Sequence, residues 1–222
     1  MITDFAIYDM DRTVTRRATY TPFLLHCALR RAQWRLLLMP LVLASMLAYV
    51  AKLIDRARLK EINHRLLLGD KRHPHILKPL VDGFARKTLA TNVRPGARGA
   101  IARDKAEGRR VIMATASYRL YASAIADQLG FDDCIGTGSI IGLDERVHAK
   151  IDGENCYGPA KLRMIADWLG KSGFERGHVR FYSDHASDAP VFEWADEAVA
   201  VNPHERLRRL AATRGWRVED WG

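Results

Sequence analysis

Four short, mostly apolar runs recur along this chain of 222 residues, and segments with helical spacing lie between most of them. Runs of this length and continuity are typical of strands buried on both faces of a parallel sheet. Their alternation with helices predicts an α/β fold in which helices cover both faces of the sheet. The predicted strands are Phe5–Tyr8, Val111–Ala114, Val179–Tyr182 and Ala198–Val201, and the predicted helices are Gly96–Glu107, Arg119–Leu129, Pro159–Leu169 and His204–Thr213.

Three glycines follow the first three of these helices closely. Glycine adopts the left-handed conformation that commonly ends a helix, so we expect helix ends at Gly108, Gly130 and Gly170.

The alternation stops between residues 15 and 92, where the patterning is helical and no strand is predicted. It resumes at Val93, immediately before the Pro95-Gly96 pair that begins the next helix. The sequence therefore predicts one α/β domain made of residues 1–14 and 93–222, with a helical insertion of residues 15–92 directly after its first strand.

The insertion contains a long apolar run, Leu36–Ala51, whose sixteen residues carry no charge and include one proline, Pro40. As a helix it would be about 24 Å long, less than the roughly 30 Å of hydrocarbon in a bilayer. Basic residues lie on both sides, which favours a helix in the membrane interface over a spanning one. The alternative is a helix buried inside the insertion. The flanking cations are Arg30, Arg31, Arg35, Lys52, Arg56, Arg58 and Lys60.

The chain is basic, with 35 Lys and Arg against 26 Asp and Glu, a net charge of +9. This balance indicates an anionic partner, either a phosphorylated substrate or an anionic membrane surface. A nucleic acid is not expected, because no nucleic-acid-binding motif is present and the cations are not gathered in one element. Cys27, Cys134 and Cys156 lack disulfide or zinc spacing, and the N-terminus does not resemble a signal peptide, so we expect a cytoplasmic protein.

Two acids, Asp9 and Asp11, follow the first predicted strand directly. The carboxyl end of a parallel strand opens into the crevice where such sheets bind ligands. Neighbouring carboxylates raise each other's pKa unless a cation compensates, and Mg²⁺ suits a few carboxylates with water and a phosphate oxygen. The pair therefore predicts a magnesium site, although an isolated pair of this kind can equally be a solvated turn.

Other polar residues follow the same rule at later strand ends and at one helix start. Thr115 and Ser117 end the second strand, Lys161 lies in the first turn of a helix, and Asp184 and Asp188 follow the third strand. Singly, these residues could be a turn hydroxyl, a surface lysine and helix caps. Together, and in this order, they predict one site at the carboxyl ends of the strands.

The segments DMDRT, TAS, GPAK and SDHASD resemble, in order, the four motifs of the haloacid dehalogenase superfamily of phosphatases. The insertion resembles the helical cap of the phosphoserine-phosphatase-like subclass. The resemblance implies a Rossmann-like parallel sheet with a helical cap inserted after the first strand, and hydrolysis of a phosphomonoester.

The resemblance also implies a role for each matched residue. Asp9 would be the nucleophile that forms a phospho-aspartyl intermediate, and Asp11 the general acid and base. Thr115 and Lys161 would neutralise phosphoryl oxygens. Mg²⁺ would be held by Asp9, Asp11 through its backbone carbonyl, Asp184 and Asp188, and the substrate would be contacted by Arg12, Thr13 and Ser117.

The insertion also bears on the substrate. Phosphoserine phosphatases of this subclass carry a glutamate where this chain has Ala18, which speaks against an amino-acid substrate. The cap is similar to that of the phosphatidylglycerophosphatase C family, which implies a lipid phosphate such as phosphatidylglycerophosphate and a peripheral location on the cytoplasmic face of the inner membrane. The alternatives are a soluble phosphatase of a small metabolite and a non-catalytic basic binding module.

Overall fold

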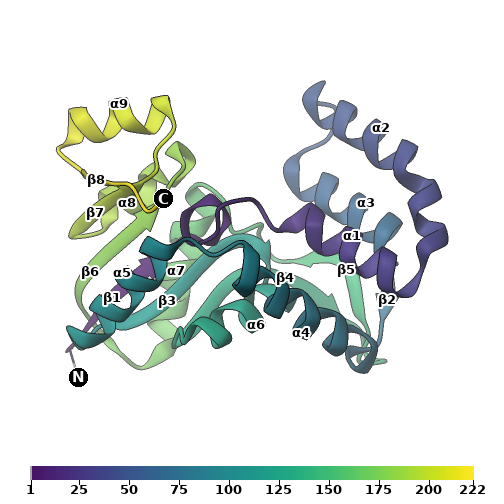
Figure 1. The fold of residues 1–222 in the computed structure, drawn as a ribbon, viewed down its shortest axis with the longest axis horizontal. Coiled ribbons are helices and arrows are strands. Elements are labelled where there is room, and N and C mark those ends of the chain that lie inside the picture. The colour runs from purple at the N-terminus through teal and green to yellow at the C-terminus, as the bar shows by residue number, and fades with distance from the viewer. Residues whose placement is uncertain (1) are drawn as a thin grey trace.

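A computed structural model of the protein describes residues 2–222 and contains one sheet of eight strands (Figure 1). The strand order is β2-β5-β4-β3-β1-β6-β7-β8; β2 and β5 are antiparallel to their neighbours and the other pairings are parallel. The predicted α/β fold is therefore confirmed. The strands are β1 (Ile2–Tyr8), β2 (Lys71–Arg72), β3 (Arg110–Tyr118), β4 (Asp133–Ile141), β5 (Val147–Asp152), β6 (Glu175–Ser183), β7 (Glu197–Val201) and β8 (Arg217–Glu219).

Helices cover both faces of the sheet, and alternate residues of β1 bury into the two resulting cores. Ala6 and Tyr8 pack in one core with α5 and α6, whereas Phe5 and Ile7 pack in the other with α7, α8 and α9. All four of these side chains are inaccessible to solvent, as expected for a central parallel strand. The helices are α5 (Pro95–Ala106), α6 (Arg119–Leu129), α7 (Pro159–Ser172), α8 (Ala189–Trp194) and α9 (Glu205–Arg214), with a short 3₁₀ turn η3 (Ala186–Asp188) before α8.

One predicted helix end is wrong. Gly170 lies inside α7, which continues to Ser172, and the left-handed residue that ends it is Gly173 with φ 74°. Gly130 does end α6 in the left-handed conformation, with φ 79°.

The chain between β1 and α5 forms a turn, four α-helices, a 3₁₀ segment and β2. They are η1 (Met10–Val14), α1 (Tyr20–Arg31), η2 (Gln33–Leu38), α2 (Met39–Val50), α3 (Arg56–Leu67) and α4 (Pro74–Thr91). In Figure 1, α1, α2 and α3 lie together to one side of the sheet domain, whereas α4 runs beside α6. The expectation of no strand in this region is wrong, because β2 adds to the edge of the sheet through β5.

The two connections between this segment and the sheet domain run side by side. Thr15 and Val93 form an isolated antiparallel bridge, and the Arg16 N–H donates to the Asn92 carbonyl at 2.7 Å. The chain thus leaves the sheet domain and returns to it at one place.

The apolar run of the insertion is largely exposed. Pro40 begins α2 at a position where its missing N–H costs no hydrogen bond, so it does not interrupt the helix. Val42 and Ser45 face inward, and the Ser45 hydroxyl donates to Asn63 of α3 at 2.8 Å. The window Gln33–Val50 is long and apolar enough to cross a membrane by length and composition, and only 11% of it is buried. A helix buried within the insertion is therefore not what the structure shows.

Candidate active site

The carboxyl ends of β1, β3 and β6 meet the insertion at a cavity of about 370 Å³. Its floor comes from the sheet domain and its opposite wall from α1, α2 and α3. The predicted residues that line its floor are Asp9, Asp11, Arg12, Ser117, Lys161, Asp184 and Asp188. The residues that line its wall are Tyr20, Met46, Tyr49, Arg56, Lys60 and Asn63. Seven of the nine residues predicted for one site thus share one cavity.

Asp9 is the first residue after β1, and its backbone N–H donates to the Tyr182 carbonyl at 2.9 Å, which extends the pairing with β6. Its carboxylate is buried and accepts from Lys161 Nζ at 2.8 Å. Burial raises the pKa of Asp9 to about 8; Lys161 opposes this shift, and Asp188 and Asp184 add to it. A charged Asp9 therefore depends on the cations placed around it.

Lys161 lies in the first turn of α7, which begins with Pro159 after Gly158 in a positive-φ conformation. Its ammonium donates to Asp9 Oδ1 at 2.8 Å and Asp188 Oδ2 at 2.7 Å, and the side chain is 2% exposed. Burial lowers the pKa of Lys161, but the two carboxylates outweigh it and hold the pKa above its usual value. Lys161 is therefore a buried cation that joins two acids, not a solvated surface lysine.

Thr13 joins a second pair of acids. Its hydroxyl lies 3.2 Å from both Asp9 Oδ2 and Asp184 Oδ1, and it accepts from the Asp184 backbone N–H at 2.9 Å. The side chain is fully buried and does not line the cavity. The prediction that Thr13 contacts substrate is therefore not supported; the structure uses it to position carboxylates.

Asp188 has one satisfied and one open oxygen. Oδ2 accepts from Lys161 and from the Ser183 hydroxyl at 2.7 Å each, whereas Oδ1 is buried without a hydrogen-bond partner. A buried acceptor left open costs about 1–3 kcal/mol unless a ligand completes it. The open oxygen is therefore a donor atom available to a cation.

The metal-binding prediction can be tested against this geometry. Among residues 2–222, no three His, Cys, Asp or Glu side chains stand close enough together to form a ready ligand set. Mg²⁺ does not require one, because it is commonly held by one or two carboxylates, with water and substrate oxygens completing the octahedron. Asp9 and Asp184, joined through Thr13, and the open oxygen of Asp188 are donors of this kind. The residues present fit Mg²⁺.

Asp11 has its carboxylate held by the neighbouring elements. Oδ1 accepts from the Thr19 N–H and hydroxyl at 2.7 Å each, and Oδ2 accepts from the Ser117 hydroxyl at 2.6 Å. The Tyr121 hydroxyl in turn donates to Ser117 at 2.6 Å. Ser117, predicted to bind substrate, lines the cavity, but its hydroxyl already donates its hydrogen bond to Asp11. A metal contact from Asp11 would therefore come from its backbone carbonyl.

Thr115 is fully buried in the C-terminal half of β3 and does not line the cavity. Its hydroxyl accepts from the Ser117 backbone N–H at 3.0 Å, so it shapes the irregular part of the strand that carries Ala116 and Ser117. Arg12 occupies the left-handed region with φ 68°, and its exposed guanidinium lies at the cavity. Within residues 2–222 that guanidinium has no hydrogen-bond or ion-pair partner, so it is free to meet an anion.

Sequence reasoning missed Lys60 as a site residue and placed it among the cations flanking the apolar run. It is only 7% exposed, and its ammonium donates to the Ala116 carbonyl and, at 2.6 Å, to Asn155 Oδ1. Burial lowers the pKa of Lys60 to about 8, and Arg56 adds to the shift. The spacing of Arg56, Lys60 and Asn63 along α3 places all three on one helix face and was the available signal.

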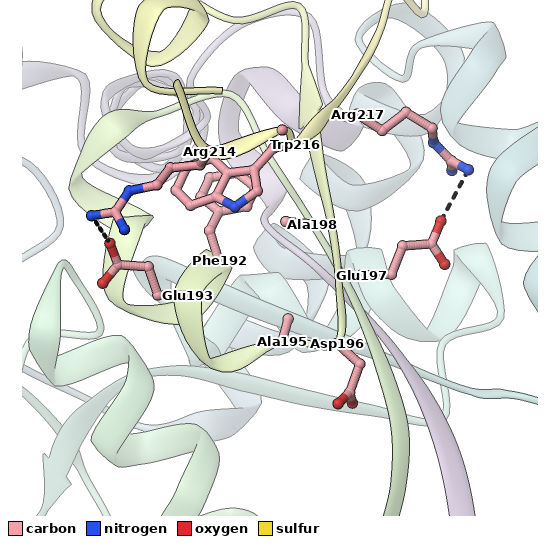
Figure 2. Close-up of a pocket in the computed structure, with 10 residues that line it drawn as sticks. Phe192, Glu193, Ala195, Asp196, Glu197, Ala198, Arg214, Trp216 and Arg217 are labelled. Atoms are coloured by element: carbon pink, nitrogen blue, oxygen red, sulfur yellow. Dashed lines mark ion pairs between the residues drawn. The ribbon is translucent and has the colours of Figure 1, made fainter. Parts of the chain in front are cut away.

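A larger cavity, of about 840 Å³, lies at the N-terminal end of β7 and contains none of the predicted residues. Figure 2 shows Trp216 over Phe192 there, with ion pairs from Arg214 to Glu193 and from Arg217 to Glu197. Its charges thus compensate one another, which is typical of a structural surface. The predicted site residues line the smaller cavity instead.

Sequence comparison gives relatives among hydrolases. A phosphoserine phosphatase of Mycobacterium tuberculosis is 32% identical over 114 residues, which make up 51% of this chain and 37% of that protein. A Streptomyces azureus protein named for inhibition of morphological differentiation is also 32% identical over 114 residues, 51% of this chain and 41% of its own length. The chain spans less than half the length of these curated relatives.

Structural comparison gives the same fold. A Bordetella pertussis protein of unknown function superposes with a TM-score of 0.89 and 23% identity over 100% of both chains. A probable phosphoserine phosphatase from Vibrio cholerae superposes with a TM-score of 0.71 and 14% identity over 99% of this chain and 61% of that one. A family model described as haloacid dehalogenase-like hydrolase matches residues 6–193. The chain belongs to the haloacid dehalogenase-like hydrolase family.

Proposed function

We propose that the protein is a Mg²⁺-dependent phosphomonoester hydrolase that acts through a phospho-aspartyl intermediate on Asp9. The observation that carries the proposal is the buried cluster in which Lys161 joins Asp9 to Asp188 and Thr13 joins Asp9 to Asp184, inside one cavity. A binding module has no use for three acids and a lysine buried together, because such a cluster costs desolvation energy.

The chemistry assigns a step to each carboxylate. An oxygen of Asp9 attacks phosphorus, and the bond from phosphorus to the alcohol oxygen breaks. Asp11 gives that oxygen a proton and then takes one from the water that cleaves the acyl phosphate, which releases inorganic phosphate and restores both acids. Lys161 keeps Asp9 ionised and balances charge on the phosphoryl oxygens.

The metal would be held by Asp9, Asp184, the backbone carbonyl of Asp11 and Asp188. When bound, Mg²⁺ supplies a positive charge that lowers the repulsion between the phosphate and the carboxylates. Thr13 orients the carboxylates of Asp9 and Asp184, and Ser117 orients that of Asp11.

We further propose a lipid phosphate as substrate, for which phosphatidylglycerophosphate is one chemical example. Met46 and Tyr49 of α2 line the cavity, while Leu43, Leu47 and Val50 of the same helix are more than half exposed. The helix that forms the cavity wall therefore also carries the exposed apolar surface. Immersing that surface in a bilayer would stabilise the complex by roughly 1.5–3 kcal/mol for each leucine fully removed from water.

The basic residues near α2 suit an anionic leaflet, such as the cytoplasmic face of the inner membrane. Arg30, Arg31 and Lys52 are exposed beside the apolar run. Lys60 does not belong to this set because it is buried. Arg35 does not belong to it either, because its guanidinium donates to the carbonyls of Arg65 and Leu66. The second candidate, a soluble phosphatase of a small metabolite, is favoured only by the modest volume of the cavity.

A phosphate-release panel tests the proposal. Phosphatidylglycerophosphate, lysophosphatidate, phosphoserine and a sugar phosphate are compared with Mg²⁺ and with a chelator, in the natural protein and in Asp9→Asn. We expect Mg²⁺-dependent release that Asp9→Asn abolishes, with the lipid phosphates turned over fastest. Release that survives Asp9→Asn contradicts the mechanism, and rapid turnover of soluble phosphates alone, with no flotation on anionic liposomes, contradicts the lipid assignment.

A further inference from the structure

A second cavity, which we call the α1–α4 pocket, lies between α1 and the C-terminal part of α4, beside the two connections to the sheet domain. Its volume is about 660 Å³, within the range of sites for small organic ligands. Its lining combines four cations with an apolar wall: Arg16, Arg17, Arg30 and Lys87, with Leu25, Leu29 and Phe84.

The charge of the α1–α4 pocket is not compensated. No Asp or Glu is among its lining residues, and within residues 2–222 the side chains of Arg16, Arg17, Arg30 and Lys87 form no ion pair or hydrogen bond. In the cavity of Figure 2, by contrast, Arg214 and Arg217 each lie 2.9 Å from a glutamate. Four like charges around one hollow repel one another, and an anion bound among them relieves that repulsion.

The pKa of His26, which also lines the pocket, responds to the cations around it. Burial lowers the pKa of its imidazole, and Arg30 and Lys87 lower it further. The histidine ring packs against Phe84 with centroids 5.7 Å apart, so it forms part of the apolar wall instead of adding another cation.

The apolar wall restricts the kind of anion. Leu29 is 52% exposed at the pocket and Phe84 is buried behind it. A free inorganic anion would bring its own hydration to this wall and gain nothing from it, whereas a ligand with an apolar group beside its charge covers it.

We propose that the α1–α4 pocket binds the anionic headgroup of an amphiphile, separately from the phosphoryl site at Asp9. The two cavities share Ala18 and Pro22 as lining residues, so a headgroup held here lies next to the active-site cavity. The pocket needs no catalytic residue, and its occupancy does not depend on whether the protein is a phosphatase.

Calorimetric titration with dihexanoyl phosphatidylglycerol tests this proposal, because that lipid is a soluble phosphodiester with an anionic headgroup and no phosphomonoester. We expect one bound molecule in the natural protein and in Asp9→Asn. Arg30→Gln with Lys87→Gln should weaken binding about tenfold or more, since each removes a charge-assisted contact. Arg214→Gln, in the cavity of Figure 2, is the matched control and should change the affinity less than twofold.

Two further ligands separate charge from apolarity. Dihexanoyl phosphatidylcholine keeps the chains without net charge, and inorganic phosphate keeps the charge without chains; each should bind at least about tenfold more weakly. Leu29→Gln, which keeps every cation, should weaken phosphatidylglycerol binding and leave the weak binding of phosphate unchanged. The proposal is overturned if the Arg30 and Lys87 double variant binds phosphatidylglycerol as tightly as the natural protein does. It is also overturned if the natural protein binds phosphatidylcholine or inorganic phosphate as tightly as it binds phosphatidylglycerol.

Discussion

Lys161 Nζ lies 2.8 Å from Asp9 Oδ1, and both side chains are buried at the junction of β1 and α7. The same ammonium also holds Asp188. One cation therefore serves two carboxylates that would otherwise repel each other, so its removal should affect both folding and reaction.

Lys161→Met should lower the free energy of unfolding by about 3–5 kcal/mol, since it leaves two acids buried without their partner. Phosphate release should fall by at least about a hundredfold, as expected for loss of a group that balances transition-state charge. Lys171→Met is the control, because Lys171 lies on the same helix and pairs with Asp167 in solvent. Equal stability of the two variants in urea unfolding would contradict the assigned role of Lys161.

Thr13→Val keeps the shape of the side chain and removes its hydroxyl from Asp9 and Asp184. If these acids hold the metal, the Mg²⁺ concentration for half-maximal activity should rise by about tenfold or more, because groups that orient ligands affect metal affinity on this scale. Thr213→Val, on the exposed face of α9, should leave the Mg²⁺ dependence unchanged. Normal Mg²⁺ dependence in the Thr13→Val enzyme would show that Thr13 plays no part in metal binding.

Lys60→Met should raise KM more than it lowers kcat. Lys60 holds Ala116 and Asn155 from across the cavity and does not contact Asp9, so its loss loosens substrate positioning more than chemistry. We expect a fall in kcat/KM of roughly tenfold, about the worth of one hydrogen bond to a charged group. Lys171→Met, which alters an exposed cation on α7, should behave as the natural protein does. A change confined to kcat would argue against a positioning role.

His64 should make the protein sensitive to acid. Both of its ring nitrogens are buried without partners, and burial lowers its pKa from 6.5 to about 4. Because the unfolded chain takes up the proton first, stability is fully present above pH 6.5 and falls as pH drops toward 4, by about 3 kcal/mol in total.

His64→Phe removes the titrating group and keeps a ring against Tyr118. Its unfolding free energy should decline less than that of the natural protein between pH 6.5 and pH 4, measured by urea unfolding at each pH. Parallel decline of the two proteins would assign the acid sensitivity to other groups.

The exposed face of α2 should govern membrane association. Replacing Leu43, Leu47 and Val50 together by Ser should abolish flotation with phosphatidylglycerol liposomes, since it removes the apolar surface that would enter the bilayer. Hydrolysis of a soluble aryl phosphate should stay within about twofold, because these side chains do not line the cavity. Leu143→Ser, at the exposed turn between β4 and β5, is the control and should float normally. Undiminished flotation of the triple variant would reassign membrane contact to another surface.

Much of the sheet could be predicted because its central strands contain short, mostly apolar runs. The predicted helix Arg119–Leu129 has the bounds that α6 has in the structure. The β4–β5 hairpin could not be predicted in the same way, since β4 contains Gly136 and Gly138 and shows no apolar run. β2 is only two residues long and exists through its pairing with β5. Local sequence carries no signal for such a contact.

The site was predictable to the level of which segments meet, but not of what each side chain does there. The ends of β1 and β6 and the start of α7 place Asp9, Asp184 and Lys161 together whatever their rotamers. The inward turn of Lys60 and the use of Thr13 as a bridge depend on packing between distant elements. A lysine after an apolar run looks the same in sequence whether it faces headgroups or a cavity.

The position of α4 beside α6 ties the insertion to the sheet domain. Phe84 of α4 packs edge-on against Tyr121 of α6, and Phe23 of α1 stacks on the same tyrosine with centroids 4.3 Å apart. The last helix of the insertion is thereby anchored in the same apolar core as β1 and β3. α3 is held to the sheet domain as well, through Lys60 on Ala116 and His64 on Tyr118. Three of the four α-helices of the insertion are therefore fastened to the domain that carries Asp9, which keeps the two sides of the cavity in register.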